Sequence, residues 1–330
     1  MENESKIRLL SLCKLLYERS DEAHPLSTTQ IIEILKNEYS ISAHRTTISK
    51  DVDVLKEFGV NVGKIESTQN KYFIERRLFE TSELKLLIDA VESSKFITDS
   101  KSKELVNKLT LMTSSEKAGE IKRNLLAEDR IRPENESIYG IVDAINEAIN
   151  NGKKISFQYF QYSVNKKKKL KNKGEIYIFS PYSLVWNGDY YYVVGYSDKH
   201  ENIGSFRVDR IADTPRVLKD DAVPMPAGFD LSEFLKTTFR MFNRKPETVE
   251  LICDNGVIDS IIDRFGEEVK IYANDMETFR AVVNVAISHV FFSWVFGFGG
   301  KVKIKGPENI KESYANMVKE AYEMIKQYRF

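Results

Sequence analysis

Residues 40–74 constrain the fold of this chain most, because a helical period gives way there to a strand period. From Ser42 to Phe58 the apolar positions recur at helical spacing, which predicts one buried face formed by Ile48, Val52 and Leu55. Gly59 ends this helix, and two strand-like runs with polar residues between them follow, Val60–Ile65 and Lys71–Ile74. A helix followed by a β-hairpin is typical of a winged helix-turn-helix, whose second helix can enter a major groove.

The residues before this stretch supply the rest of such a module. Residues 4–20 are amphipathic, and Ser27 is a suitable N-cap for a helix over Thr28–Tyr39. Three helices and a wing that ends near Arg76 predict a DNA-binding domain over residues 1–77.

The outward side of the predicted second helix begins with side chains that can bond phosphates or base edges. Thr28, at the start of the preceding helix, can offer a backbone N–H and a hydroxyl to a phosphate, and the wing can reach the DNA backbone or the minor groove. The candidate DNA contacts are Thr28, His44, Arg45, Thr46, Thr47, Ser49, Lys50, Lys64, Lys71 and Tyr72, with Asn70 beside them.

Acidic residues dilute this patch, because Asp51, Asp53 and Glu57 lie on the same helix. We expect Asp51 to point away from Lys50 and to bond within the fold. The alternative is a winged helix that makes only protein contacts, with the polar residues as a solvated face.

The composition limits what else the chain can be. Its 330 residues predict two or three domains, and its net charge is zero, so a DNA surface must be a local basic patch. The two cysteines, Cys13 and Cys253, are predicted to be buried free thiols. The N-terminus lacks the apolar core of a signal peptide and no apolar run reaches membrane-spanning length, so we expect a cytoplasmic chain without a membrane partner.

No catalytic constellation is visible in the sequence. The four histidines are scattered, and neither a nucleophile-and-base motif nor a metal-ligand spacing occurs. The glycine-containing run from Phe296 to Lys301 lacks the spacing of a phosphate-binding loop and is read as a helix end. We therefore expect neither an enzyme nor a bound cofactor.

Residues 78–136 are predicted to form a helical linker, because their period stays helical. Its helices are expected over Thr81–Ser94, Ser100–Thr113 and Ser115–Leu126, with a loop over Asp129–Glu136.

Residues 137–221 then change period. After a helix from Ser137 to Asn150, strand-like runs occur at Lys154–Tyr162, Glu175–Val185, Asp189–Tyr196 and Ile203–Arg207, and Asn187-Gly188 predicts a hairpin turn. Short strands after one helix predict a small curved sheet or barrel. The lysines of Lys166–Lys169, Lys171 and Lys173 can be a solvated loop or a nucleic-acid clamp.

The C-terminal part follows a proline-containing connector over residues 222–246, which has a helix around Leu231–Thr238. Over residues 247–330 the predicted order is βαββαβ with a final helix, which is the ferredoxin-like pattern. Its predicted elements are Val249–Cys253, Val257–Phe265, Val269–Ala273, Phe279–Val285, Val290–Phe296, Lys301–Lys305 and Glu308–Gln327.

Three segments carry a family resemblance. The start resembles bacterial winged helix-turn-helix regulators through Ser42, Arg45, Thr46, Lys50, Asp51, Leu55 and Gly59, with Lys50 in place of an arginine. The middle resembles the WYL domain through Pro181–Leu184, Asn187-Gly188 and Phe206–Ile211, although the naming triplet is Tyr190-Tyr191-Tyr192. The last 80 or so residues resemble the extension that follows WYL domains, best over Leu251–Phe265 and Trp294–Tyr328.

This resemblance implies a homodimeric, ligand-gated transcription factor. WYL domains are similar to Sm-type small β-barrels, and a nucleic-acid or nucleotide-like effector is implied for their basic and aromatic surface. The implied fold class is α+β multidomain: winged helix-turn-helix, helical linker, Sm-like barrel and ferredoxin-like C-terminal domain.

Candidate effector contacts lie near the second half of the WYL-like segment. Arg207 is expected to project from the sheet towards Tyr191, because residues 206–211 alternate along a strand end. An exposed guanidinium beside tyrosine rings suits a phosphate with a stacked base. The full candidate set is Tyr159, Ser180, Tyr182, Tyr191, Arg207 and Arg210. The alternative is an internal Asp209–Arg210 salt bridge, with the tyrosines in the core or in a dimer contact.

The sequence therefore favours a regulator that binds a double-stranded operator and senses a nucleic-acid or nucleotide effector. The rival interpretation is an RNA-binding, single-strand-binding or nucleic-acid-processing protein without operator specificity.

Overall fold

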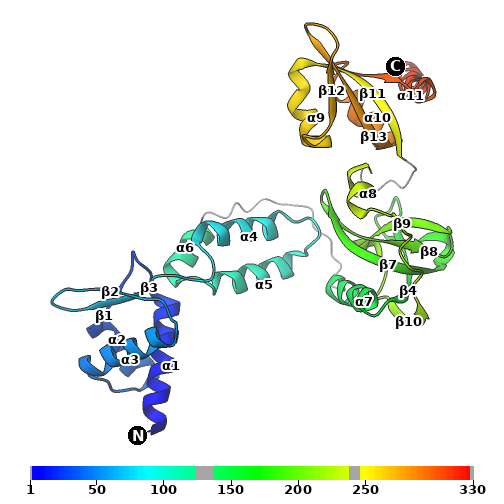
Figure 1. The fold of residues 1–330 in the computed structure, drawn as a ribbon. Coiled ribbons are helices and arrows are strands. Elements are labelled where there is room, and N and C mark those ends of the chain that lie inside the picture. The colour runs from blue at the N-terminus through cyan, green and yellow to red at the C-terminus, as the bar shows by residue number, and fades with distance from the viewer. Residues whose placement is uncertain (1, 124–136, 238–245, 328–330) are drawn as a thin grey trace. The chain divides into compact units, whose positions relative to one another are not determined.

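The computed structural model describes residues 2–123, 137–237 and 246–327 (Figure 1). The chain divides into two compact units, residues 1–134 and 135–330. The predicted loop over Asp129–Glu136 and the predicted helix ends at Leu126 and Thr238 lie outside the described residues.

The first unit begins with three helices and a small sheet. The helices are α1 (Glu2–Arg19), α2 (Thr28–Tyr39) and α3 (Arg45–Glu57), and the strands are β1 (Leu26–Ser27), β2 (Val62–Ile65) and β3 (Lys71–Ile74). The sheet order is β1-β3-β2, and both pairings are antiparallel. The sequence did not predict β1, because two residues are too short for a periodic signal.

Local signals fix where these helices begin and end. Ser27 caps α2 as predicted, in a capping box in which its hydroxyl accepts from the Gln30 backbone N–H and the Gln30 side chain accepts from the Ser27 N–H. Gly59 follows α3 with a φ of +97°, a conformation that favours glycine. The core beneath the helices contains Leu12, Leu16, Ile31, Leu35, Ile48 and Val52.

Cys13 is only half-buried, unlike Cys253. The prediction of a fully buried thiol is therefore wrong for Cys13. Burial nevertheless raises the pKa of both thiols, that of Cys253 to about 12, so both favour the neutral form.

Three further helices complete the described part of the first unit: α4 (Thr81–Ser93), α5 (Asp99–Thr110) and α6 (Ser115–Arg123). They pack around a small core of Leu84, Ile88, Val106 and Ile121. Buried Asp21, just after α1, accepts a short hydrogen bond from the Ser114 hydroxyl at the start of α6 and also contacts His24 at 2.9 Å. This contact joins the winged-helix part of the unit to its helical part.

The second unit begins with a helix and a five-stranded antiparallel sheet. The helix is α7 (Ile138–Asn150), and the sheet order is β10-β4-β7-β8-β9. The strands are β4 (Lys153–Gln158), β7 (Ile176–Asn187), β8 (Tyr190–Ser197), β9 (Asn202–Arg207) and β10 (Arg216–Asp221). No pairing joins β9 to β10 within the described residues, and an isolated bridge links Tyr159 to Ile211 instead.

A second hairpin stands beside this sheet. The single strand expected over Lys154–Tyr162 is divided into β4 and β5 (Phe160–Tyr162), and β5 pairs with β6 (Lys168–Leu170). Part of the lysine run is thus an ordered strand rather than a loop. The 3-10 helices η1 (Lys171–Gly174) and η2 (Val208–Arg210) follow β6 and β9.

The helix α8 (Leu231–Thr237), predicted within a connector, packs on one face of the five-stranded sheet. Its Leu231, Phe234 and Leu235 lie against Val185 and Tyr192. This contact buries the side of β8 that carries Tyr192 and Val194.

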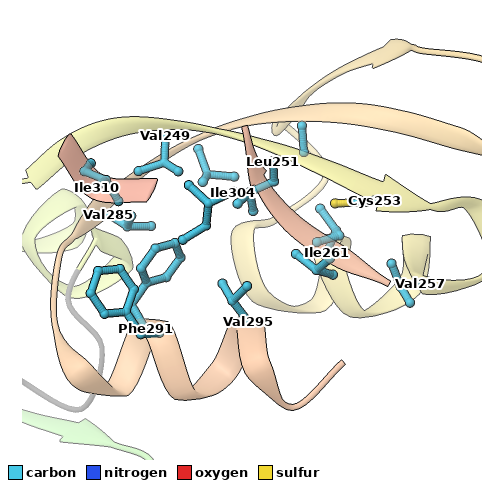
Figure 2. Close-up of a cluster of buried hydrophobic side chains, with 14 of the residues drawn as sticks. Val249, Leu251, Cys253, Val257, Ile261, Val285, Phe291, Val295, Ile304 and Ile310 are labelled. Carbon is cyan, nitrogen blue, oxygen red and sulfur yellow. The ribbon is translucent and has the colours of Figure 1, made fainter. Parts of the chain in front are cut away.

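The C-terminal elements are β11 (Pro246–Asp254), η3 (Asn255–Val257), α9 (Ile258–Phe265), β12 (Lys270–Ala273), β13 (Thr278–Ala286), α10 (His289–Phe296), β14 (Val302–Gly306) and α11 (Glu308–Gln327). The four strands form an antiparallel sheet in the order β12-β13-β11-β14. The helices α9, α10 and α11 pack on one face of this sheet, and Figure 2 shows Val249, Leu251, Phe291 and Val295 meeting there. Alternation along β11, β13 and β14 sends every second side chain into this core, whereas the residues of β12 are exposed.

Candidate nucleic-acid interface and sensor surface

The helix α3 separates apolar from polar side chains by its own period. Ile48, Val52 and Leu55 are buried, whereas Arg45, Thr46 and Lys50 are exposed. Thr47 and Ser49 are half-buried, and His44 is exposed at the N-cap without a side-chain capping bond. The start of α3 therefore presents two cations and several hydroxyls on its solvent side.

Asp51 is removed from this surface by an internal ion pair. Arg8 of α1 donates from Nε to Asp51 Oδ2 at 2.6 Å and from Nη2 to Oδ1 at 3.2 Å. The structure thus confirms that Asp51 bonds within the fold. Asp53 and Glu57 remain exposed farther along α3, so the basic patch is confined to the first turns.

A chain of polar contacts links α3 to α2 and the wing. Arg45 donates to the Thr29 hydroxyl at 3.4 Å, and that hydroxyl lies 3.4 Å from Gln69 Oε1. Thr29 and Gln69 were not predicted, although Thr29 follows directly after the helix start at Thr28. These contacts hold Arg45 between the two helices and the tip of the wing.

Two predicted DNA contacts are wrong, because β1 pairs with β3. Thr28 is buried, and its backbone N–H and hydroxyl both donate to the carbonyl of Asn70 at 3.0 Å. Tyr72 is 2% exposed and belongs to the core. The backbone N–H and hydroxyl of Thr28, which the sequence assigned to a phosphate, are therefore already bonded within the fold.

The other wing candidates are exposed. Lys71 lies at the start of β3, and Lys64 lies on β2 with its ammonium 2.9 Å from Glu66. The hydrogen bond that Lys64 donates to the Glu66 carboxylate raises the pKa of Lys64. The wing therefore presents two cations, Lys64 and Lys71, of which Lys64 forms an ion pair with Glu66.

In the second unit, hydrogen bonds and a ring contact hold the Arg207 side chain within the fold. Its Nε and Nη2 donate to the two carboxylate oxygens of buried Asp209 at 3.0 and 2.7 Å. Its guanidinium carbon lies 3.3 Å from the centre of the Tyr190 ring, and its backbone N–H donates to the Tyr159 hydroxyl at 3.2 Å. Burial favours a lower pKa for Arg207, but the hydrogen bonds and charge of Asp209 outweigh it and raise that pKa.

The expectation that Arg207 meets Tyr191 is wrong because of strand register. Arg207 lies opposite Tyr192 in the β8–β9 ladder, so its side chain shares a face with Tyr190 and Tyr192. Tyr191 points to the other face, where its ring centre is 5.3 Å from that of Trp186. The internal salt bridge of Asp209 is made mainly with Arg207, since Arg210 Nε is 4.0 Å away.

The structure also places other predicted effector contacts inside the fold. Ser180 is fully buried, and its hydroxyl accepts from the Val223 N–H at 3.0 Å, so its assignment is wrong. Tyr159 packs edge-on against Phe206, and burial raises its pKa to about 12. Tyr182 is half-buried and donates to the Pro224 carbonyl at 3.2 Å.

Arg210 differs from these residues, because it faces the β5–β6 hairpin. Its guanidinium carbon lies 4.8 Å from the Tyr162 ring centre and 5.8 Å from that of Phe160. The Lys168 ammonium lies 5.0 Å from the Phe160 ring, and Tyr162 is 49% exposed. We call Phe160, Tyr162, Lys168 and Arg210 the hairpin surface. The sequence indicated the lysine run and Arg210, but not that an aromatic strand joins them.

Comparison with known protein families identifies both halves of the second unit. The model of the WYL domain matches residues 140–215. The chain is a WYL-domain protein. The model of the WCX domain matches residues 245–322, so the WYL domain is followed by the expected C-terminal extension.

Solved structures offer more remote likenesses to this WYL-domain protein. One is proteasome accessory factor B/C (PafBC) of Arthrobacter aurescens, with 16% identity and a TM-score of 0.29 over 93% of this chain and 45% of that one. Another is a CRISPR Cas-related protein, with 12% identity and a TM-score of 0.38 over all of this chain and 82% of that one. The chain spans less than half of PafBC. No curated protein matches the sequence.

Two further properties concern the described ranges only. No group of three or more His, Cys, Asp or Glu side chains there is arranged to hold a metal ion. None of the helices described is both long and apolar enough to cross a membrane.

We predict that Arg207→Ala lowers the stability of the WYL domain, because it leaves the buried Asp209 carboxylate without its bidentate partner. Breaking a buried pair costs about 3–5 kcal/mol, and partial exposure of Arg207 reduces the expected loss to about 2–3 kcal/mol. Chemical denaturation of the full chain measures it. Arg216→Ala on β10 is the control, and a double Arg207→Ala, Asp209→Ala variant should lose less than the sum of the single changes. A wild-type unfolding midpoint for Arg207→Ala contradicts the structural role.

Proposed function

We propose that this WYL-domain protein is a homodimeric, DNA-binding transcriptional regulator. In this proposal the first unit reads a double-stranded operator, and the WYL domain senses a nucleic-acid or nucleotide-like effector. The observation that carries the proposal is the exposed start of α3, where Arg45, Thr46 and Lys50 face solvent while Asp51 is held inside by Arg8. Catalysis forms no part of the proposed role.

The proposal includes a fold assignment for each part. Helices α1–α3 with the β2–β3 wing are assigned as a winged helix-turn-helix, and the five-stranded sheet as an Sm-like barrel. The WCX sheet is assigned as ferredoxin-like, which its order β12-β13-β11-β14 and its helix crossovers support.

The hairpin surface is the proposed effector site. Tyr162 offers an exposed ring for stacking, and Arg210 and Lys168 place cations beside aromatic rings. Such a surface suits a phosphate that is followed by a stacked base. The effector changes operator binding only if its affinity differs between the two conformations of the regulator.

A second function, single-strand or RNA binding without an operator, is favoured by this same surface and by the exposed lysines near it. The two functions differ in duplex specificity. An operator reader should prefer promoter duplex to random duplex and should lose that preference when α3 is altered, whereas a general single-strand binder should prefer neither duplex.

The first variants that test DNA reading are Arg45→Ala and Lys50→Ala. Each should weaken operator binding, by about 1–3 kcal/mol if the side chain reads a base, or with a reduced salt slope if it contacts a phosphate. Fluorescence anisotropy with promoter duplex at several salt concentrations measures both effects. Lys103→Ala, on α5, removes the same charge outside the winged helix and should bind normally. Wild-type binding by both α3 variants rules out this helix as the reader.

For the effector site, Arg210→Ala and Tyr162→Ala should each reduce effector affinity roughly tenfold, because each removes one partner of a cation–aromatic pair. Their operator affinity without effector and their melting temperatures should stay near those of wild type. Titration with short single strands and with linear or cyclic nucleotides provides the measurement, and Arg216→Ala serves as a charge-matched control. An equal loss of effector affinity in the control, or no loss in either variant, contradicts the assignment of the hairpin surface as the effector site.

Self-association follows from the geometry of operator reading, because one winged helix covers a single half-site and two-fold symmetry supplies the second. The proposed contacts are the helical segment 81–127 and the C-terminal domain. Light scattering at micromolar concentration should return about twice the chain mass of 38.1 kDa. A single-chain mass with and without DNA contradicts the dimer.

A further inference from the structure

The WCX sheet has a second face that its helices do not cover. The inward residues of β11 and β13, such as Val249, Leu251 and Val285, are buried in the core (Figure 2). The residues between them point to the opposite face, because side chains alternate along a strand. On that face Lys270, Tyr272, Lys303 and Lys305 are exposed, and Ile252 and Val282 are half-buried.

Register lines these outward residues up across all four strands. Tyr272 lies opposite Arg280, Arg280 opposite Ile252, and Ile252 opposite Lys303. A neighbouring row contains Lys270, Val282 and Glu250. With strands about 4.8 Å apart, the first row is roughly 14 Å long and the second roughly 10 Å. We call these two rows, with Lys305, the WCX open face.

The open face is mainly basic. It carries Lys270, Arg280, Lys303 and Lys305, against one central carboxylate, Glu250. That carboxylate lies 3.3 Å from Arg280 and 3.4 Å from Lys305 and holds both cations in place. Lys270 and Lys303 make no ion pair with another described residue, so they add positive charge at both edges of the sheet.

Aromatic chemistry is present on the same surface. The Tyr272 ring is 46% exposed, and the Arg280 guanidinium carbon lies 4.7 Å from its centre. A base can stack on an exposed ring while neighbouring cations meet the phosphates that flank it, an arrangement that sheet surfaces use for single strands. The combination distinguishes this face from a merely solvated one.

We propose that the WCX open face binds a single-stranded nucleic acid, with Tyr272 stacking a base and Lys270, Lys303 and Lys305 contacting phosphates. A duplex does not fit this role, because a major groove admits a helix or a two-stranded ribbon rather than the face of a four-stranded sheet. A second copy of the chain fits poorly as well, since an isologous contact brings this basic face against itself. The site is separate from the hairpin surface and does not depend on it.

The test measures binding of fluorescent thymidine and uridine homo-oligonucleotides to the full chain. Tyr272→Ala and a double Lys270→Ala, Lys303→Ala variant should each weaken binding about five- to tenfold. The lysine variant should also reduce the salt slope by about 0.7 for each phosphate that its side chains no longer neutralise. Comparison of the two oligonucleotides shows whether the ribose hydroxyl contributes.

The chain supplies a matched control for the tyrosine. Tyr322 on α11 is 56% exposed and also carries a cation, Lys326, 4.5 Å from its ring centre. Tyr322→Ala and Lys319→Ala should therefore leave binding unchanged. Glu250→Gln should tighten binding, because it removes the one anion that competes with phosphate for Arg280 and Lys305.

Photo-crosslinking separates this site from the proposed effector site. An oligonucleotide with a photoreactive base should crosslink to a peptide containing Tyr272 in wild type and in Arg210→Ala. Crosslinks confined to residues 1–77 or 137–221 overturn the proposal while leaving the effector site intact. A change of oligomeric mass in Tyr272→Ala without a change of oligonucleotide affinity also overturns it and assigns the face to self-association.

Discussion

The WYL domain of this protein depends on the contact between Arg207 and Asp209. Asp209 is buried in a short 3-10 helix, and the two hydrogen bonds from Arg207 satisfy its carboxylate at the end of β9. Because Arg207 also lies on Tyr190, the pair fixes the turn that directs the next cation, Arg210, to the β5–β6 hairpin. Arg207 thus positions the hairpin surface, and Arg210 is the cation that we propose for ligand binding.

The same division between internal and outward charge occurs in the first unit. Arg8 takes Asp51 out of the outward face of α3, while Arg45 is held exposed by contact with Thr29. Without the first pair, a buried carboxylate would lack a partner and the helix would be less firmly held against α1. In both units a basic side chain neutralises a buried acid inside the fold, and a second cation lies on the same helix or turn.

Periodicity predicted most elements of this fold, and register and short strands account for what it missed. The bounds of α2, β3 and α11 agree with their predicted ranges, because a capping box, a polar turn and Pro307 mark them in the sequence. The two-residue strand β1 has no period, yet it buries Thr28 and Tyr72. Likewise, only the β8–β9 register shows that Arg207 shares a face with Tyr190 rather than Tyr191.

The proposed regulator is expected to bind duplex and single strand at separate surfaces, the duplex at an operator-reading helix and single strands at the WYL effector surface and the WCX open face. Hydrogen–deuterium exchange of the full chain, alone and with each ligand, tests it most directly. Promoter duplex should slow exchange in α3 and the wing, residues 45–74. A single strand should slow it in residues 160–170, around Arg210 and on the WCX open face. Protection of the same peptides by both ligands, or of neither region, contradicts the account.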